Sequence, residues 1–292
     1  MSLIATVIRK IGRYYVKPFA VVGASTPILG RLNPILEIIT GRLAPLGDIL
    51  YERERIEGIR CERTTPTDHT DLTIIYFHGG GFQFGSPKGH RNLTTRLALD
   101  TRAQIISVDY TLGAYGPAER EAERVVKSIL DTPGRYMVAG DSAGGNLAFH
   151  IGHLYGHKLE AVIGISPWVD LTKQTKGDRD PLISAIAINA AARRYLQGAH
   201  PKYASKYDCS DSMLTETTTI LHYCDDEILA RGIDKLVDNL VYAGKIPKIR
   251  SYKGLFHVFQ ILGGIIPEAD DAVRDLANDI KSVYNGNSTE TI

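Results

Sequence analysis

Ser142 stands at the centre of Gly140-Asp141-Ser142-Ala143-Gly144, a pentapeptide that fits the pattern G-x-S-x-G. An apolar run precedes the pentapeptide and a helical pattern follows it, which places the serine at a strand-to-helix turn. Such a turn strains the backbone and exposes the serine hydroxyl above a sheet, and small neighbours avoid collisions with the adjoining strand and helix. A plain glycine-rich turn would also match the pentapeptide, but the flanking strand and helix favour a nucleophile.

A serine nucleophile needs donors for the oxyanion that its attack creates. The segment HGGGF, residues 78–82, directly follows a predicted strand at 72–78. Backbone N–H groups in a glycine run can approach a substrate closely, because no β-carbon stands in the way. The sequence therefore predicts an oxyanion-binding loop at this point.

The nucleophile also needs a base, and the base needs a carboxylate to orient it. His257 follows the last apolar strand, at the edge of an α/β sheet where active sites lie. The acid should lie in the loop after the strand at 217–223. That loop offers Asp225, Asp226 and Glu227, and all three are near enough.

Other polar residues have simpler interpretations. Three histidines with helical spacing resemble a metal cluster, but no carboxylate or cysteine joins them in the sequence, so we predict no metal site. These are His150, His153 and His157. Residues expected to be structural rather than chemical are His78, Asp141, Trp168 and Asp170.

The elements that must position these residues alternate along the chain. Continuous apolar runs, typical of strands covered on both faces, lie at 72–78, 103–110, 136–141, 160–166, 217–223 and 248–252. Helical patterns cover 117–130, the run after Ser142, 229–244 and 268–284. This alternation predicts right-handed crossovers and a largely parallel sheet.

One interval, 172–216, contains no strand but includes an alanine-rich helical stretch at 181–198. A structureless loop of this length is unusual in a compact domain, so we interpret the interval as a cap. A chain of 292 residues with 43% hydrophobic content can bury one large α/β core. Its net charge of +1 argues against a nucleic-acid partner.

The N-terminal segment is basic and amphipathic but too interrupted for a membrane-spanning helix. Helices packed on the body of the protein are the favoured interpretation, and peripheral contact with a membrane surface is the alternative. Three widely spaced cysteines suggest neither a disulfide framework nor a zinc site, which favours a reducing compartment such as the cytoplasm. The sequence also leaves open that the protein forms a homodimer.

Four motifs together resemble the hormone-sensitive-lipase group of α/β-hydrolases, in the group's order and at about its spacing. They are HGGGF (78–82), GDSAGG (140–145), SPWVDLT (166–172) and GLFHVFQ (254–260). The resemblance covers residues 50–285 and implies an α/β-hydrolase fold, with a mostly parallel eight-stranded sheet, flanking helices and a helical cap. It also implies that the protein is a serine carboxylesterase, acting on short to medium acyl or acetyl esters of an apolar alcohol.

Carried over by position, the resemblance makes Ser142 the nucleophile, His257 the base and Glu227 the acid. In the group the acid lies two residues before a leucine that starts a helix, as Glu227 does before Leu229. The oxyanion donors would be the N–H groups of Gly80, Gly81 and Ala143. No metal or organic cofactor is required.

The resemblance also implies domain boundaries. Residues 1–48 form the N-terminal part of the cap, 172–216 form the cap insertion, and 49–171 with 217–285 form the core. A polar tail at 286–292 is expected to be disordered.

The chain departs from the group's pattern in two loops, DYTLGAYGP (109–117) and TETTT (215–219). Both are expected to affect the substrate more than the chemistry. They leave open a non-hydrolytic enzyme on the same fold, such as a cyclase or an acyltransferase. A ligand receptor resembling the plant gibberellin receptors, which have lost the base, is disfavoured by His257.

Overall fold

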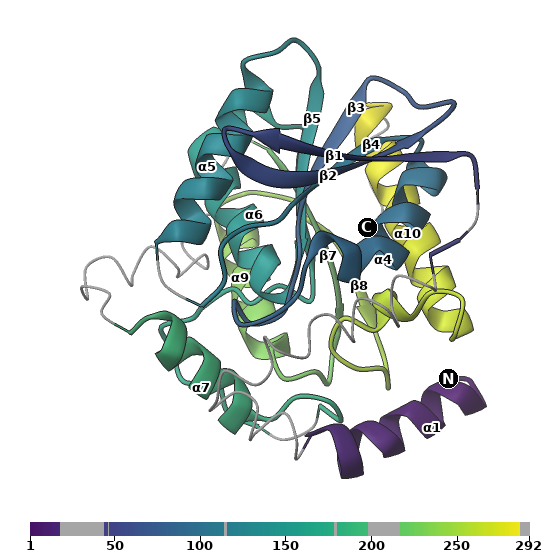
Figure 1. Ribbon diagram of the computed structural model, residues 1–292. Helices are drawn as coiled ribbons and strands as arrows, with labels where there is room; N and C mark the ends of the chain where they lie inside the picture. Colours follow the sequence, from purple (N-terminus) through teal and green to yellow (C-terminus); the bar gives the residue numbers. More distant parts are fainter. Residues whose placement is uncertain (18–43, 46, 114–115, 178–179, 198–216, 287–292) are drawn as a thin grey trace.

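The computed structural model describes residues 1–17, 44–45, 47–113, 116–177, 180–197 and 217–286 (Figure 1). Its centre is an eight-stranded sheet with the order β1-β2-β4-β3-β5-β6-β7-β8. The strands are β1 Ile49–Ile56, β2 Ile59–Pro66, β3 Leu72–Phe77, β4 Gln104–Val108, β5 Arg135–Asp141, β6 Ala161–Ile165, β7 Thr218–Cys224 and β8 Lys248–Tyr252. The predicted sheet is confirmed, including all six apolar strands.

Strands β3 to β8 pair in parallel, whereas β1 pairs with β2, and β2 with β4, in antiparallel fashion. The five consecutive buried residues of β6 show why these central strands read as apolar runs. β1 and β2 form a hairpin at the edge, joined by Glu57 and Gly58, which both have positive φ. This pair of strands was missing from the predicted elements.

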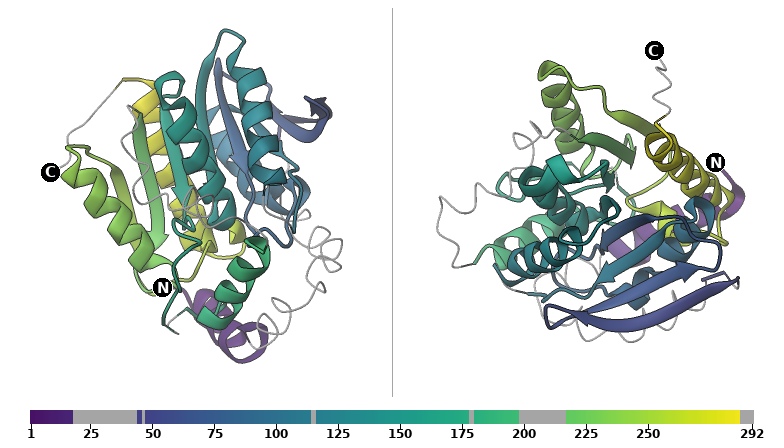
Figure 2. Two further views of the ribbon diagram at one scale, coloured as in Figure 1. Left: turned by 90° about the vertical axis from the view of Figure 1, so that its left-hand side faces the viewer. Right: turned by 90° about the horizontal axis from the view of Figure 1, so that it is seen from above.

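Helices cover both faces of the sheet (Figure 2). Buried side chains of α5, α6 and α9 pack in the core on one face, and those of α4 and α10 pack on the other. The helices of the described residues are α1 Leu3–Ile11, α4 Pro87–Thr101, α5 Pro117–Leu130, α6 Ser142–Tyr155, α7 Ala185–Tyr195, α9 Ala230–Tyr242 and α10 Pro267–Tyr284. The helices predicted at 117–130, 229–244 and 268–284 are confirmed to within two residues at each end, and the helix predicted after Ser142 is α6. The helical stretch predicted at 181–198 contains the shorter α7, and α4 was missing from the predicted elements.

The N-terminal segment and the insertion after β6 meet at one end of the sheet, where α1 and α7 lie near each other (Figures 1 and 2). A β-carbon added at Gly12 would come within 2.4 Å of the Leu182 side chain, so the two segments touch. Much of the predicted cap, at 18–43 and 198–216, and the predicted tail at 287–292 lie outside the described residues. Within the described part of the chain, no helix combines the length and apolarity that a membrane crossing requires.

Candidate active site

Ser142 lies where β5 ends and α6 begins, with a left-handed φ of 51°. Two glycines allow this turn. A β-carbon on Gly140 would lie 2.3 Å from the backbone of Gly144, and one on Gly144 would lie 2.0 Å from the Phe77 carbonyl oxygen. The local sequence therefore forces strand, serine and helix into the sharp arrangement expected from the G-x-S-x-G pattern.

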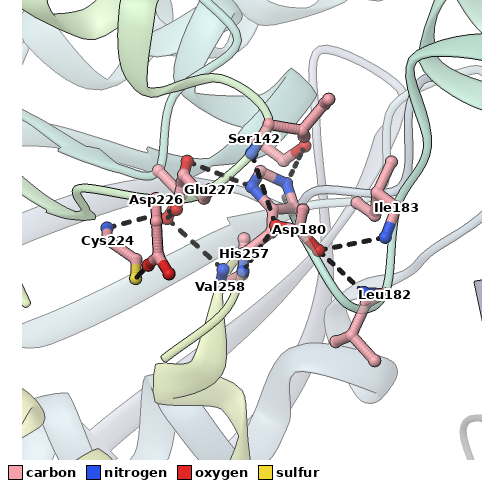
Figure 3. A network of polar contacts seen from close by, with 11 residues as sticks. Ser142, Asp180, Leu182, Ile183, Cys224, Asp226, Glu227, His257 and Val258 are labelled. Carbon is pink, nitrogen blue, oxygen red and sulfur yellow. Dashed lines mark hydrogen bonds and ion pairs between the residues drawn. The ribbon is translucent and has the colours of Figure 1, made fainter. Parts of the chain in front are cut away.

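The structure brings three predicted residues together (Figure 3). The Ser142 Oγ lies 2.8 Å from Nε2 of His257, and Nδ1 of His257 lies 3.3 Å from Oε1 of Glu227. His257 follows β8, Glu227 follows β7, and all three side chains are buried. Each imidazole nitrogen thus has one partner, the hydroxyl on one side and the carboxylate on the other.

The other two acidic candidates point elsewhere. Asp226 accepts a hydrogen bond from the Cys224 thiol at 3.0 Å and lies 3.8 Å from the Arg9 guanidinium. Asp225 is exposed, and its N–H donates to the Tyr252 carbonyl oxygen. Of the three candidates, Glu227 reaches the imidazole.

Ser166, which directly follows β6, supports this carboxylate and was not foreseen from the sequence. Its hydroxyl donates a 2.6 Å hydrogen bond to Oε2 of Glu227 and accepts the Val258 N–H at 3.3 Å. The Cys224 N–H donates to the same Oε2 at 3.2 Å. The only sequence signal was its place at the start of the SPWVDLT motif, directly after an apolar strand.

Burial alone would lower the pKa of His257, because a buried imidazolium loses its hydration. The carboxylates of Glu227, Asp180 and Asp141 together outweigh this effect, Glu227 most of all by charge and hydrogen bonding, and the net result is a pKa above the usual 6.5. The arrangement therefore favours a proton on the imidazole, which is what a base needs after it has taken one from a hydroxyl.

The glycine loop after β3 has a backbone conformation that favours glycine. Gly80 and Gly81 have φ values of 120° and 59°, a region that disfavours side chains. A β-carbon on Gly80 would lie 2.0 Å from the Phe84 carbonyl oxygen. At the other side of the serine, Ala143 is buried at the first turn of α6.

Asp141 holds the glycine loop by a hydrogen bond, in agreement with the structural role expected for it. Its Oδ1 accepts the Gly79 N–H at 2.8 Å and the Tyr76 hydroxyl at 2.7 Å. Its Oδ2 lies 3.4 Å from Nε2 of His90. Burial opposes charge on both partners, but the pairing prevails, raising the pKa of His90 and lowering that of Asp141.

His78 packs within the same loop. Its ring stacks on Tyr110 with centroids 4.3 Å apart, and the Tyr110 hydroxyl donates to the His78 carbonyl oxygen at 2.6 Å. Burial, together with the nearby His90, lowers the pKa of His78 to about 3. The ring is therefore neutral near pH 7 and serves to shape the loop.

Trp168 and Asp170 also make structural contacts. The Trp168 backbone N–H donates to the Ser142 carbonyl oxygen at 2.8 Å, and the Trp168 carbonyl oxygen accepts the Asn146 side-chain amide at 3.0 Å. The Asp170 carboxylate closes a turn by accepting the N–H groups of Thr172 and Lys173, at 2.9 and 3.1 Å.

The three histidines do not converge. His150 pairs with Glu123 across 2.8 Å, which corrects the expectation that no carboxylate joins them, because Glu123 lies on the neighbouring helix α5. His157 lies beyond the end of α6, in the 3₁₀ turn Gly156–Lys158. Among the described residues, the side chains close enough to share a metal are those of Cys224, Asp225 and Asp226. Burial raises the pKa of Cys224 and so favours the thiol, which is a poor metal ligand.

Helix α7 covers the glycine loop from the cap side. The ring of Phe82 stacks on that of Tyr195 with centroids 3.8 Å apart, and the Tyr195 hydroxyl donates to Glu119. A β-carbon on Gly81 would lie 3.6 Å from the side chain of Ala191. The contact between α7 and the glycine loop is therefore aromatic and aliphatic, with one buried hydroxyl–carboxylate contact beside it.

Known proteins share this sequence pattern. A family profile described as the alpha/beta hydrolase fold matches residues 74–261. An esterase of Acinetobacter venetianus is 29% identical over 266 residues, which cover 84% of this chain and 86% of that protein. The hormone-sensitive lipase of Ictidomys tridecemlineatus is 36% identical over 163 residues, which cover 49% of this chain and 21% of that protein.

Solved structures share the fold. An esterase of the bacterial hormone-sensitive lipase family superimposes with a TM-score of 0.82 at 21% identity, covering 97% of this chain and 98% of that one. The resemblance drawn from the four motifs is confirmed by these comparisons, and so is the fold.

Proposed function

The chain belongs to the α/β-hydrolase fold family, and from this premise we propose that it is a serine carboxylesterase with Ser142 as nucleophile, His257 as base and Glu227 as acid. The observation that carries the proposal is the 2.8 Å separation between the Ser142 Oγ and Nε2 of His257, at a left-handed turn between strand and helix. A hydroxyl held this close to an imidazole nitrogen can lose its proton as it attacks.

In the first half of the reaction, the Ser142 Oγ attacks the ester carbonyl carbon while Nε2 of His257 takes the hydroxyl proton. Nδ1–H of the imidazolium donates to the Glu227 carboxylate, which stabilises the charge. We assign the N–H groups of Gly80, Gly81 and Ala143 to the oxyanion of the tetrahedral intermediate. The alcohol then leaves with the proton from Nε2, and an acyl-enzyme remains.

In the second half, a water molecule takes the place of the alcohol. His257 accepts its proton at Nε2, the resulting hydroxide attacks the acyl carbonyl, and a second tetrahedral intermediate forms at the same donors. Collapse of this intermediate returns the proton to the Ser142 Oγ and releases the carboxylic acid. The residues named above supply every proton transfer, so the mechanism needs no metal or organic cofactor.

We propose an apolar substrate with an acyl group of short to medium length, and contacts of the cap support its apolar character. The described part of the insertion places Tyr195 and Ala191 over the glycine loop, and both belong to the buried apolar core. An acyl or alcohol group entering beside Ser142 would therefore meet hydrocarbon surface, and its burial would contribute about 25 cal/mol per Å². We propose that the N-terminal segment also forms part of this apolar cap, because its residue Gly12 touches Leu182 of the insertion.

The test combines a covalent probe with substrate turnover. Wild-type protein should hydrolyse p-nitrophenyl esters of short and medium acyl chains, and a fluorophosphonate should label it at one serine. Ser142→Ala should keep the fold, measured by circular dichroism, and lose both turnover and labelling. Labelling that persists in Ser142→Ala would assign the nucleophile to another residue. Labelling of Ser142 without turnover of any ester would point to a non-hydrolytic reaction.

A further inference from the structure

Asp180 is a fully buried carboxylate in the insertion between β6 and α7, and the sequence motifs did not draw attention to it. Its Oδ1 accepts the N–H groups of Leu182 and Ile183, at 2.8 and 3.0 Å. Its Oδ2 accepts one from His257 at 3.1 Å (Figure 3). The same oxygen accepts another from Ile228 at 3.4 Å. Both oxygens accept and neither donates, which is the pattern of an ionised carboxylate.

The two donors on Oδ2 come from two different catalytic loops. His257 is the proposed base itself, and Ile228 is the residue directly after the proposed acid, Glu227. One oxygen of the insertion therefore bridges the backbone of the acid loop and the backbone of the base loop. The 3.3 Å contact between the Glu227 carboxylate and the imidazole depends on how far apart these two loops lie.

We propose that Asp180 is a positioning residue of the catalytic triad, whose carboxylate holds the acid loop and the base loop at the separation that the Glu227–His257 hydrogen bond requires. The proposal rests on the esterase function proposed above. It gives the insertion a part in the chemistry in addition to covering the substrate.

A carboxylate suits this position better than any neutral side chain. Each of its oxygens meets two N–H donors, so an amide in its place would turn its own NH₂ group toward two of them. A buried donor left without an acceptor costs free energy comparable to a lost hydrogen bond. Charge-assisted hydrogen bonds are also about twice as strong as neutral ones, which favours a fixed loop geometry.

The N-terminal segment is attached at the same point. The Lys17 ammonium donates a buried 2.8 Å hydrogen bond to the Asp180 carbonyl oxygen. Arg9 of α1 donates to the carbonyl oxygens of Gly254 and Leu255, which lie just before the base on its loop. Both parts of the proposed cap are thus bonded to the backbone around the triad.

The charge on Asp180 also affects the pKa of His257, which gives a second, independent way to test its role. Burial lowers the pKa of His257, Glu227 raises it most, and the carboxylates of Asp180 and Asp141 raise it further. Arg9 is a further charged group bonded to the base loop, through the carbonyl oxygens of that loop. Loss of the Asp180 charge removes one contribution that favours imidazolium, so the pKa of His257 falls.

The test uses the full-length protein with Asp180→Asn, which keeps size and removes charge. The control is Asp170→Asn, because Asp170 closes the same kind of turn by accepting two backbone N–H groups but is not bonded to either catalytic loop. We expect kcat of Asp180→Asn to fall about 10- to 100-fold, the scale of a small misplacement of reacting groups, with KM little changed. Asp170→Asn should stay within about twofold of wild type.

The pH profile separates positioning from a merely structural role. The base must be neutral to accept the Ser142 proton, so the acid limb of kcat/KM follows the pKa of His257. In Asp180→Asn this limb should move to lower pH, whereas partial unfolding would lower activity at every pH without moving it. A wild-type kcat, or a loss of kcat with an unmoved acid limb, would overturn the proposal.

Two further measurements test the proposal if Asp180→Asn does not fold or if the protein hydrolyses no ester. If Asp180→Asn does not fold, Asp180→Glu replaces it: the charge remains but the carboxylate is displaced, so kcat should fall at least about 10-fold while the acid limb stays. A wild-type kcat there would overturn the proposal. The rate at which a fluorophosphonate labels Ser142 should fall in parallel in either variant. Because labelling needs no ester turnover, it tests Asp180 even if the esterase assignment itself fails.

Discussion

The hydroxyl of Ser166 donates a 2.6 Å hydrogen bond to the Glu227 oxygen that is turned away from His257. The same hydroxyl accepts the N–H of Val258, the residue after the proposed base. Ser166 therefore bonds to the acid and to the base loop at once, from a third strand of the sheet. Its backbone has a positive φ of 46°, so a strained residue directly follows β6.

Ser166→Ala should lower kcat about 10-fold, because a hydrogen bond to a charged group contributes about 1.5–3 kcal/mol and the Glu227 carboxylate keeps its bond from the Cys224 N–H. Steady-state kinetics and thermal unfolding would be measured side by side. Ser282→Ala is the control, since that hydroxyl donates to a helix carbonyl oxygen on α10. A wild-type kcat in Ser166→Ala would show that Glu227 needs no such support.

Glu227→Gln should lower kcat by about 10⁴, the loss seen when a triad carboxylate is replaced by its amide in a well-studied serine protease. Asp226→Asn is the matched control, because Asp226 is the adjacent carboxylate and contacts Cys224 rather than the imidazole. It should stay within a few-fold of wild type. A large loss of kcat in Asp226→Asn with a near-wild-type Glu227→Gln would instead assign the acid to Asp226.

Gly80→Ala should lower kcat by about 10²–10³, the scale of losing one oxyanion donor. The new methyl group would collide with the Phe84 carbonyl oxygen, and the φ of 120° disfavours a side chain as well. Gly58→Ala is the control: its φ of 79° is also positive, but its β-carbon meets open space. That variant should lose about 1 kcal/mol of stability and keep its kcat.

Asp279→Asn should destabilise the protein near neutral pH and not in strong acid. Burial would raise the pKa of Asp279, but hydrogen bonds from His222 and Arg250 prevail and lower it from 3.8 to about 2. A carboxyl with a lowered folded-state pKa stabilises the fold above its unfolded pKa and loses this contribution as the pH falls through its folded pKa.

The expected loss of unfolding free energy is roughly 1–2 kcal/mol at neutral pH, and it should shrink as the pH falls from the unfolded pKa toward the folded one. Urea unfolding at several pH values would measure it. Asp271→Asn, at an exposed carboxylate on the same helix, should show no such dependence. A loss of stability that does not vary with pH would mean that the pairing of Asp279 is not electrostatic.

The buried strands could be predicted from the sequence because both of their faces are covered, which leaves continuous apolar runs such as 161–165. The edge hairpin gave no such signal. Strand β1 reads ILYERERI and is exposed along most of its length, so charged residues interrupt the apolar pattern that would indicate a strand. Its connection through Glu57 and Gly58 was the available sign, an x-Gly pair of the kind that favours tight hairpin turns.

Helix α4 was missed for a different reason. Its buried face mixes apolar side chains with polar ones, among them Asn92 and Thr94, so its apolar stripe is interrupted. Asn92 compensates by donating to the carbonyl oxygens of Ile261 and Gly263. Such pairing depends on residues far along the chain, which a local pattern cannot reveal.

The candidate site divides in the same way. Ser142 and the glycine loop have local signals, because their backbone geometry requires particular neighbours. The choice of Glu227 over Asp225 and Asp226 came from a resemblance, since all three carboxylates are equally near in sequence. Asp180 and Ser166 had no signal of this kind, because their partners lie on other loops and meet them only in the fold.

Trp168 is the only tryptophan of the chain, it is buried, and its backbone N–H donates to the carbonyl oxygen of Ser142. Tryptophan emission excited apart from the tyrosines therefore comes from the single indole of a residue that is bonded through its backbone to the nucleophile. Stopped-flow fluorescence could follow acylation of Ser142 without a coloured substrate. The same signal would report whether the surroundings of the nucleophile loosen before the rest of the sheet unfolds.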